Sequence, residues 1–184
     1  MQQLISLLVE NKPGALMRVT GVLSARGYNI ESLTVARTLD PELSRMTIAV
    51  EVEATMRPLL IKQMQRLINV IQAVDLTDAP VVCREIMLVK VEVSDDKRAA
   101  LLKEAEIFRA RVVDSAPGGY TLEATGAGEK LEAFLEVLRS YGDIEVIRSG
   151  AMALPRSTRE RKTSAKRETG KTSWQPSTTK KMQV

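Results

Sequence analysis

The stretch RMTIAVEVE, residues 45–53, alternates apolar with other side chains more strictly than any other part of the sequence. In an extended strand, one face would carry Met46, Ile48, Val50 and Val52, and the other Thr47, Ala49 and Glu51. Such an alternation predicts a strand that packs one face on a core.

The neighbouring segments complete a βαββαβ order around this strand. Upstream, the apolar run 3–9 and the segment 30–37 predict strands, and Gly27 ends a helix between them. That helix has an apolar stripe made of Leu16, Val19, Val22 and Leu23. Downstream, a second helix is predicted from Leu60, Met64, Leu67, Ile68 and Ile71, and a short strand from residues 73–77.

The same order then repeats. Strands are predicted at 85–93, 109–116, 119–125 and 143–150, with helices at 96–108 and around Leu131, Phe134, Leu135 and Leu138. The predicted fold is therefore α+β, with two ferredoxin-like βαββαβ modules at residues 1–78 and 79–154. Each module would leave the far face of its sheet uncovered, so we expect oligomerisation.

Charge separates the modules from the C-terminal segment. Residues 155–184 hold nine Lys or Arg and two Glu, a charge of +7, which leaves −3 of the total +4 for residues 1–154. Low apolar content predicts that residues 155–184 form a disordered basic tail. A single cysteine, no basic leader and no apolar run of about 20 residues favour a cytoplasmic chain that does not enter a membrane.

The sequence lacks the usual residues of catalysis. It contains no histidine, and no metal-ligand spacing or G-x-G-x-x-G phosphate motif is present. Cys83 is interpreted as a structural thiol, and the GAGEK segment at 126–130 as a turn before the fourth helix. We expect no catalytic, metal or cofactor site in this chain.

A ligand site is the alternative to a simple turn at ENKPGAL, residues 10–16. Pro13 at the first helical position and Gly14 beside it would leave the backbone N–H groups of Gly14, Ala15 and Leu16 free to bind a carboxylate. The Asn11 amide could contact both an ammonium and a carboxylate. These groups suit a free amino acid, although any strand-to-helix turn can contain Asn, Pro and Gly.

Longer strings carry a family resemblance. GYNIESLTVA (27–36), LSRMTI (43–48), REIMLVKV (84–91) and RSGAMAL (148–154) are similar to the regulatory small subunit of acetolactate synthase, also called acetohydroxyacid synthase. The resemblance covers residues 1–154 and implies that the first module is an ACT domain and the second an ACT-like module. The tail is longer and more basic than the resemblance leads us to expect.

The resemblance also implies a function and a site. The chain would stimulate a separate large catalytic subunit in branched-chain amino acid biosynthesis and confer feedback inhibition by valine. Valine would bind between two paired ACT domains, against Asn11, Gly14, Ala15 and Leu16 of one protomer and Asn29 and Ile30 of the other. The large subunit would carry thiamine diphosphate, Mg²⁺ and FAD.

Two other classes compete with this interpretation. RNA-recognition domains share the βαββαβ order, but they stack bases on aromatic side chains that the central strands here lack, so nucleic acid binding is not expected. An amino-acid-sensing ACT module could instead regulate another enzyme or a transcription factor. Only the strings 27–36 and 43–48 argue against that alternative.

Overall fold

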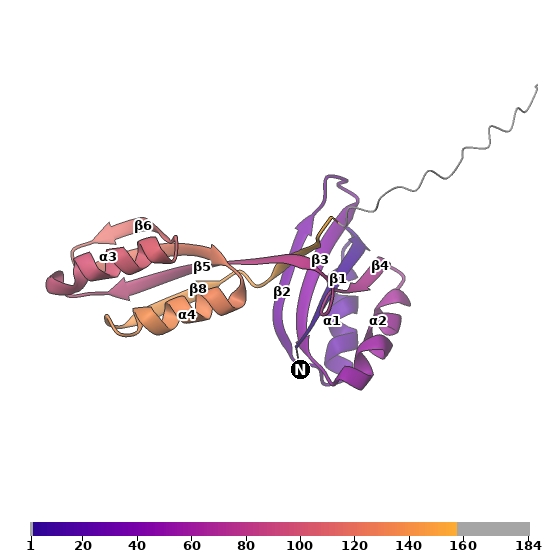
Figure 1. Cartoon of the computed structure of the whole chain (residues 1–184). Helices are drawn as coiled ribbons and strands as arrows, with labels where there is room; N and C mark the ends of the chain where they lie inside the picture. Colours follow the sequence, from indigo (N-terminus) through magenta and orange to yellow (C-terminus); the bar gives the residue numbers. More distant parts are fainter. Residues whose placement is uncertain (1, 158–184) are drawn as a thin grey trace, which may run out of the picture.

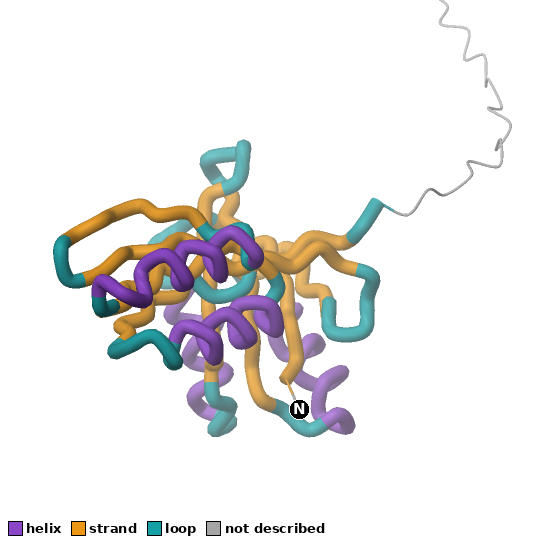
Figure 2. Tube along the Cα trace, turned by 60° about the vertical axis from the view of Figure 1, so that its left-hand side comes forward, coloured by secondary structure: helices purple, strands orange, loops and turns teal. Residues whose placement is uncertain are grey.

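A computed structural model describes residues 2–157, and it places two βαββαβ modules end to end, joined through one long strand (Figure 1). Each module is an antiparallel sheet with two helices on one face, and the two helix pairs are separate (Figure 2). The predicted α+β class with two ferredoxin-like modules is confirmed. The predicted disorder of the basic tail concerns residues that lie mostly outside the described range.

The first module comprises β1 (Gln2–Glu10), α1 (Ala15–Ala25), β2 (Ile30–Arg37), β3 (Leu43–Glu51), the 3₁₀ turn η1 (Ala54–Met56), α2 (Arg57–Gln65) and β4 (Val70–Asp75). The second comprises β5 (Val81–Glu92), η2 (Asp95–Lys97), α3 (Arg98–Ile107), β6 (Arg111–Ala116), β7 (Gly119–Gly126), α4 (Gly128–Leu138), β8 (Ile144–Arg148) and β9 (Met152–Pro155). The sheet orders β2-β3-β1-β4 and β6-β7-β5-β8 are equivalent, which confirms the repeat.

The first core forms where the alternation of β3 meets the helices. Its predicted inward face is no more than 4% exposed at Met46, Ile48, Val50 and Val52. The stripe predicted for the second helix is wrong at its end, since Ile68 is 80% and Ile71 56% exposed. Helix α2 ends at Gln65, so the helical spacing does not continue to these residues.

The second core is built in the same way. All four residues predicted on the fourth helix are buried in α4, and the Phe134 ring stacks on Phe108 with ring centroids 4.8 Å apart. Met87, Val89 and Val91 of β5 are fully buried beneath the helices. Each module therefore has a hydrophobic core of its own.

The far face of the first sheet is not left bare, contrary to the prediction. Strand β5 begins at Val81, four residues before the predicted start, and residues 81–84 pair with β9, a strand that was not predicted. This ribbon, residues 81–84 with 152–155, shares a groove with Thr47 on the sheet face opposite the helices. Thr47 is 5% and Ala49 2% exposed on that face.

The ribbon also includes the start of the range assigned to the tail. Pro155 ends β9 opposite Val81, and the Arg156 N–H donates to the Pro80 carbonyl over 2.7 Å. On the second sheet the prediction of an uncovered face holds for the single chain, because Leu88 is 41% and Ile147 66% exposed.

A close contact joins β2 to the segment between β8 and β9. The Thr34 Oγ1 donates to the Ser149 carbonyl over 3.3 Å, and the Ala151 N–H donates to Ser32 Oγ over 3.5 Å. Gly150 lies between these bonds with φ +78°, in the left-handed region. The second module is thereby attached to the strand that begins just after Asn29.

Replacing Gly150 with alanine should loosen this attachment. A Cβ built there lies 3.0 Å from Ser32 Cβ, and the left-handed backbone adds its own cost, so we expect a loss of about 1–2 kcal/mol in the free energy of unfolding. Urea unfolding measures the loss. The matched variant Gly118→Ala enters open space at an unstrained backbone and should change stability by less than about 0.5 kcal/mol. Equal stabilities for the two variants would contradict the close packing of Gly150 against Ser32.

An ionic cluster stabilises the end of β4. Asp75 Oδ2 accepts from Gln3 Nε2 over 2.8 Å and from Arg57 Nη2 over 3.1 Å, and Asp75 Oδ1 accepts from the Thr77 N–H over 2.9 Å. Burial alone would raise the pKa of Asp75, but the bonds from Thr77 and Gln3 and the charge of Arg57 outweigh it, so the pKa is lowered.

A lowered pKa makes the contribution of Asp75 dependent on pH. The stabilisation is present above the unfolded pKa of about 3.9 and is lost as pH falls through the lower folded value. Asp75→Asn should therefore cost about 1–3 kcal/mol of unfolding free energy at pH 7, and this cost should shrink steadily as pH falls below the unfolded pKa. Asp78→Asn removes a 73% exposed partner of the same Arg57 and should cost under about 1 kcal/mol. A penalty for Asp75→Asn that persists in acid would contradict this assignment.

Candidate functional site at the start of the first helix

The segment 10–16 contains the start of helix α1, which has a glycine at its N-cap. Gly14 has φ +82° and ψ −10°, so it stands outside the helix as its N-cap, and α1 begins at Ala15. Pro13 therefore precedes the N-cap, and its predicted place as the first helical residue is wrong, because a left-handed Gly14 cannot continue a right-handed helix. No side chain in the described part of the chain caps α1, and no acidic residue lies in its first turn.

The N–H groups at this helix start differ in their bonding. The Ala15 N–H donates to the Lys12 carbonyl over 3.2 Å, so it does not point freely outward as predicted. Among residues 2–157, the N–H groups of Gly14 and Leu16 have no partner. Together with the helix dipole, they form a positive site for a carboxylate.

The surface beside these N–H groups is open and apolar. No atom of the described residues lies within 4 Å of the position that a Cβ at Gly14 would take. Leu16 is 42% and Met17 74% exposed, whereas Ala15 is buried under the turn. An anion at the helix start would thus meet aliphatic side chains on one side, a combination that suits an apolar amino acid.

Asn11 connects this turn to the β2–β3 hairpin. Its Nδ2 donates to the Pro41 carbonyl over 2.9 Å, its Oδ1 accepts from Ser44 Oγ over 3.2 Å, and its N–H donates to the Glu42 carbonyl over 2.7 Å. The side chain therefore positions the turn in the single chain. One amide hydrogen and one lone pair of Oδ1 are left for a ligand.

Asn29 and Ile30 lie at the other end of α1. Eleven helical residues separate this end from Gly14, a distance of about 16 Å at 1.5 Å per residue. The Asn29 amide bonds to the Glu31 carboxylate, and the half-buried Ile30 packs against the core. One chain brings Asn11, Gly14, Ala15 and Leu16 together but holds Asn29 and Ile30 apart from them.

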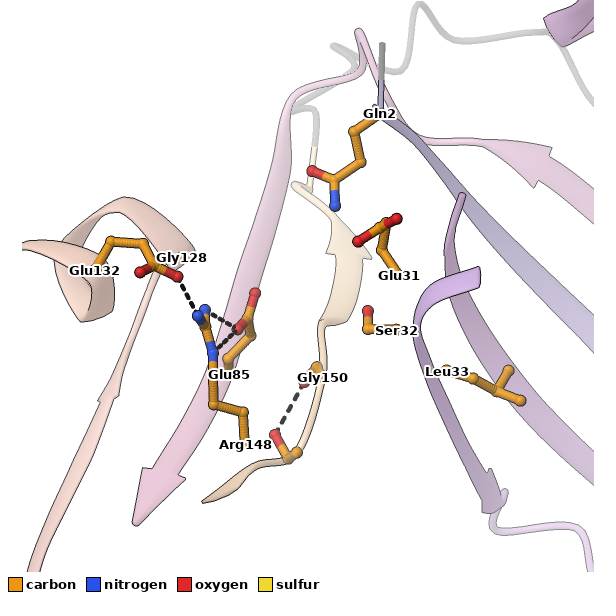
Figure 3. Close-up of a pocket in the computed structure, with 10 residues that line it drawn as sticks. Gln2, Glu31, Ser32, Leu33, Glu85, Gly128, Glu132, Arg148 and Gly150 are labelled. Atoms are coloured by element: carbon orange, nitrogen blue, oxygen red, sulfur yellow. Dashed lines mark hydrogen bonds and ion pairs between the residues drawn. The ribbon is translucent and has the colours of Figure 1, made fainter. Parts of the chain in front are cut away.

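A polar cavity of about 570 Å³ lies between the modules and was not predicted (Figure 3). Arg148 Nη2 lies 2.6 Å from Glu85 Oε2 and also pairs with Glu132 of α4, while Gln2 and Glu31 face them from the first module. Burial would lower the pKa of Arg148, but these two carboxylates raise it. The lining residues come from distant segments, so no local motif signals this cavity.

Among residues 2–157, no three His, Cys, Asp or Glu side chains are grouped so as to hold a metal ion. Within the same range, every helix is too short or too polar to cross a bilayer. Cys83 is half-buried, and burial together with the Glu85 charge raises the pKa of its thiol.

Comparisons with known proteins give a consistent result. One family model, described as the AHAS small subunit-like ACT domain, matches residues 5–72, and another, described as the small subunit of acetolactate synthase, matches residues 84–157. Over 157 residues the chain is 43% identical to a probable acetolactate synthase small subunit of Methanothermobacter thermautotrophicus, covering 85% of this chain and 94% of that one.

A bacterial relative and a solved structure agree. The chain is 45% identical over 157 residues to the acetolactate synthase isozyme 3 small subunit of Salmonella typhimurium, covering 85% of this chain and 96% of the relative. The crystal structure of the acetolactate synthase small subunit from Thermotoga maritima is similar with a TM-score of 0.77 at 34% identity, covering 86% of this chain and 99% of that one.

Proposed function

Because the chain belongs to the family of acetolactate synthase small subunits, we propose that it binds a large catalytic subunit, raises its activity and makes it sensitive to valine. The observation that supports the effector site is the start of α1, which has no side-chain cap and two N–H groups without partners in the described range 2–157, beside exposed aliphatic side chains. The chain itself takes no part in bond making.

The carbon–carbon chemistry belongs to the catalytic subunit. That subunit would join two pyruvates, or pyruvate and 2-ketobutyrate, with loss of CO₂. Thiamine diphosphate, Mg²⁺ and FAD are proposed for the catalytic subunit, where they would supply this chemistry. This chain would bind the effector, and effector binding would lower the activity of the catalytic subunit.

Two copies complete the effector site in this proposal. β2 is an edge strand, so a twofold axis beside it would pair β2 with its symmetry mate in an antiparallel manner. The start of one β2, at Asn29 and Ile30, would then approach the β2–β3 hairpin of the other copy. Asn11 bonds to that hairpin at Pro41, so the α1 start lies beside it. Such a homodimer has two identical sites, each made of residues from both protomers.

Valine fits this arrangement by charge and size. Its carboxylate would accept hydrogen bonds from the Gly14 and Leu16 N–H groups, and each bond would contribute about 1.5–3 kcal/mol to the binding free energy. Burial of its isopropyl group would contribute about 2 kcal/mol more. Valine changes activity only if it binds one arrangement of the dimer more tightly than another. A coupling of about 1–3 kcal/mol is enough for ordinary feedback inhibition.

An activity titration tests this proposal. The catalytic subunit from the same organism is titrated with the full chain, and acetolactate formation is followed with and without valine. We expect activity to rise to a plateau as the chain is added and then to fall when valine is added at the plateau. Activity that does not respond to the chain would overturn the proposed partnership, and a plateau that ignores valine would overturn the effector.

A further inference from the structure

The apolar groove between the first sheet and the β5–β9 ribbon has a volume of about 360 Å³. Its floor includes Thr34 and Thr47 of the sheet, and its wall is formed by side chains of the ribbon. Three of these wall side chains are large and open to solvent, with exposures of 40% for Val82, 49% for Met152 and 59% for Leu154.

Two arginines line this groove without a carboxylate partner among residues 2–157. Arg45 Nη1 donates to Ser6 Oγ over 3.2 Å, and Arg84 Nη1 donates to the Cys83 carbonyl over 2.6 Å. Away from the groove, Arg57, Arg98, Arg111 and Arg148 each form an ion pair, whereas exposed arginines such as Arg66 have none among residues 2–157. The groove is therefore a locally cationic apolar surface on modules whose net charge is negative.

The strands around the groove leave backbone groups open for pairing. β9 pairs only with β5, and residues 81–84 of β5 pair only with β9, because β7 begins its pairing at Glu85 and β8 at Met87. Among residues 2–157, no strand pairs with either outer edge of the ribbon, although the Val81 and Cys83 carbonyls accept from the side chains of Arg156 and Arg84. An extended peptide could add to such an edge while its alternate side chains enter the groove.

The positive charge of the groove disfavours two possible occupants, a second copy of the chain and its own C-terminal segment. A second copy that uses the same groove across a twofold axis would place the cationic surface of Arg45 and Arg84 opposite the same cationic surface of its partner. The C-terminal segment of this chain, at +7 over residues 155–184, has the same sign as the groove. The groove suits a different chain that offers apolar side chains and carboxylates.

We propose that this groove binds an extended segment of the catalytic subunit that carries apolar side chains and at least one carboxylate, an inference that rests on the proposed function. The carboxylate pairs with Arg84 or Arg45 by charge-assisted hydrogen bonds, and the apolar side chains cover Val82, Met152 and Leu154. Strand β2 contributes Thr34 to the groove and begins beside Asn29. A shift of β2 on effector binding would therefore reach the bound segment directly.

Charge reversal at the groove tests this surface in the full-length chain. The affinity for the catalytic subunit is measured by calorimetry for the wild type, Arg84→Gln, Arg84→Glu and the double variant Arg84→Glu/Leu154→Glu. We expect Kd to rise roughly tenfold for Arg84→Glu and roughly a hundredfold for the double variant, with Arg84→Gln between wild type and Arg84→Glu. The wild-type affinity should also fall more steeply with salt than that of Arg84→Glu.

Arg66→Glu is the matched control, because it makes the same charge change at an exposed residue after α2, on the helical layer. It should leave Kd within about twofold of the wild type. If the wild type binds the catalytic subunit and the groove variants bind it equally tightly, the proposed groove contact is wrong but the proposed function is not. Groove variants that sediment as smaller species would also overturn the groove contact, by making the groove a self-contact. A wild type that does not bind would overturn the proposed function as well.

Discussion

Gly14→Asp will give a chain that folds and stimulates the catalytic subunit but no longer responds to valine. The new carboxylate stands at the α1 start, where it repels the ligand's carboxylate and competes for the Gly14 and Leu16 N–H groups. Losing two charged hydrogen bonds of about 1.5 kcal/mol each would weaken valine binding at least about a hundredfold. Calorimetric titration with valine, together with inhibition of the stimulated enzyme, measures the loss.

Gly14→Ala separates charge from backbone strain in this experiment. Both variants are destabilised by a side chain at φ +82°, and a Cβ at Gly14 meets no atom of residues 2–157 within 4 Å in the single chain. The alanine variant should therefore lose similar stability but keep valine binding within about tenfold of the wild type. Full valine sensitivity in Gly14→Asp would show that the α1 start does not hold the effector.

Phe134→Ala should produce the largest loss of stability. Phe134 is fully buried at the centre of the second core and stacks on Phe108, so its truncation leaves a cavity that costs about 3–5 kcal/mol. Because the first core is separate, valine binding should survive at denaturant concentrations that unfold the second module. Urea unfolding followed by circular dichroism, with valine titration at each step, tests both parts.

Ile107→Ala is the matched control for this variant. It truncates an apolar side chain on the neighbouring helix α3, but Ile107 is 71% exposed, so its loss should cost less than about 0.5 kcal/mol. Equal destabilisation by the two variants would contradict the description of the second core. Simultaneous loss of valine binding in Phe134→Ala would show that the two modules unfold as one unit.

Local periodicity accounts for most of the fold that could be predicted. The strict alternation at 45–53 and the stripe on α4 report directly on burial, because side-chain spacing follows backbone geometry. The β5–β9 ribbon was missed because residues 81–84 pair with residues 152–155 across about 70 positions of sequence. A four-residue strand in which Met152, Ala153 and Leu154 are consecutive apolar residues carries no alternation long enough to detect.

The candidate site was predictable in part for similar reasons. The break at Asn11–Gly14 is local, so the sequence indicates a tight helix start there. The bond from Ala15 to Lys12, and the use of the Asn11 amide to bind Pro41 and Ser44, depend on the folded hairpin and leave no mark in the sequence. The resemblance, not the spacing, suggested Asn29 and Ile30, because their proposed partners belong to another copy.

Mixing two defective chains tests the two-copy site most directly. Gly14→Asp and Asn29→Asp, each alone, should abolish valine binding, since every site in either homodimer contains the change. In a purified heterodimer of the two variants, one site holds both substitutions and the other holds neither. We predict that calorimetry will find about one valine per heterodimer, bound with wild-type affinity. A heterodimer that binds no valine would show that Gly14 and Asn29 do not meet across two copies, and the proposed effector site would be wrong.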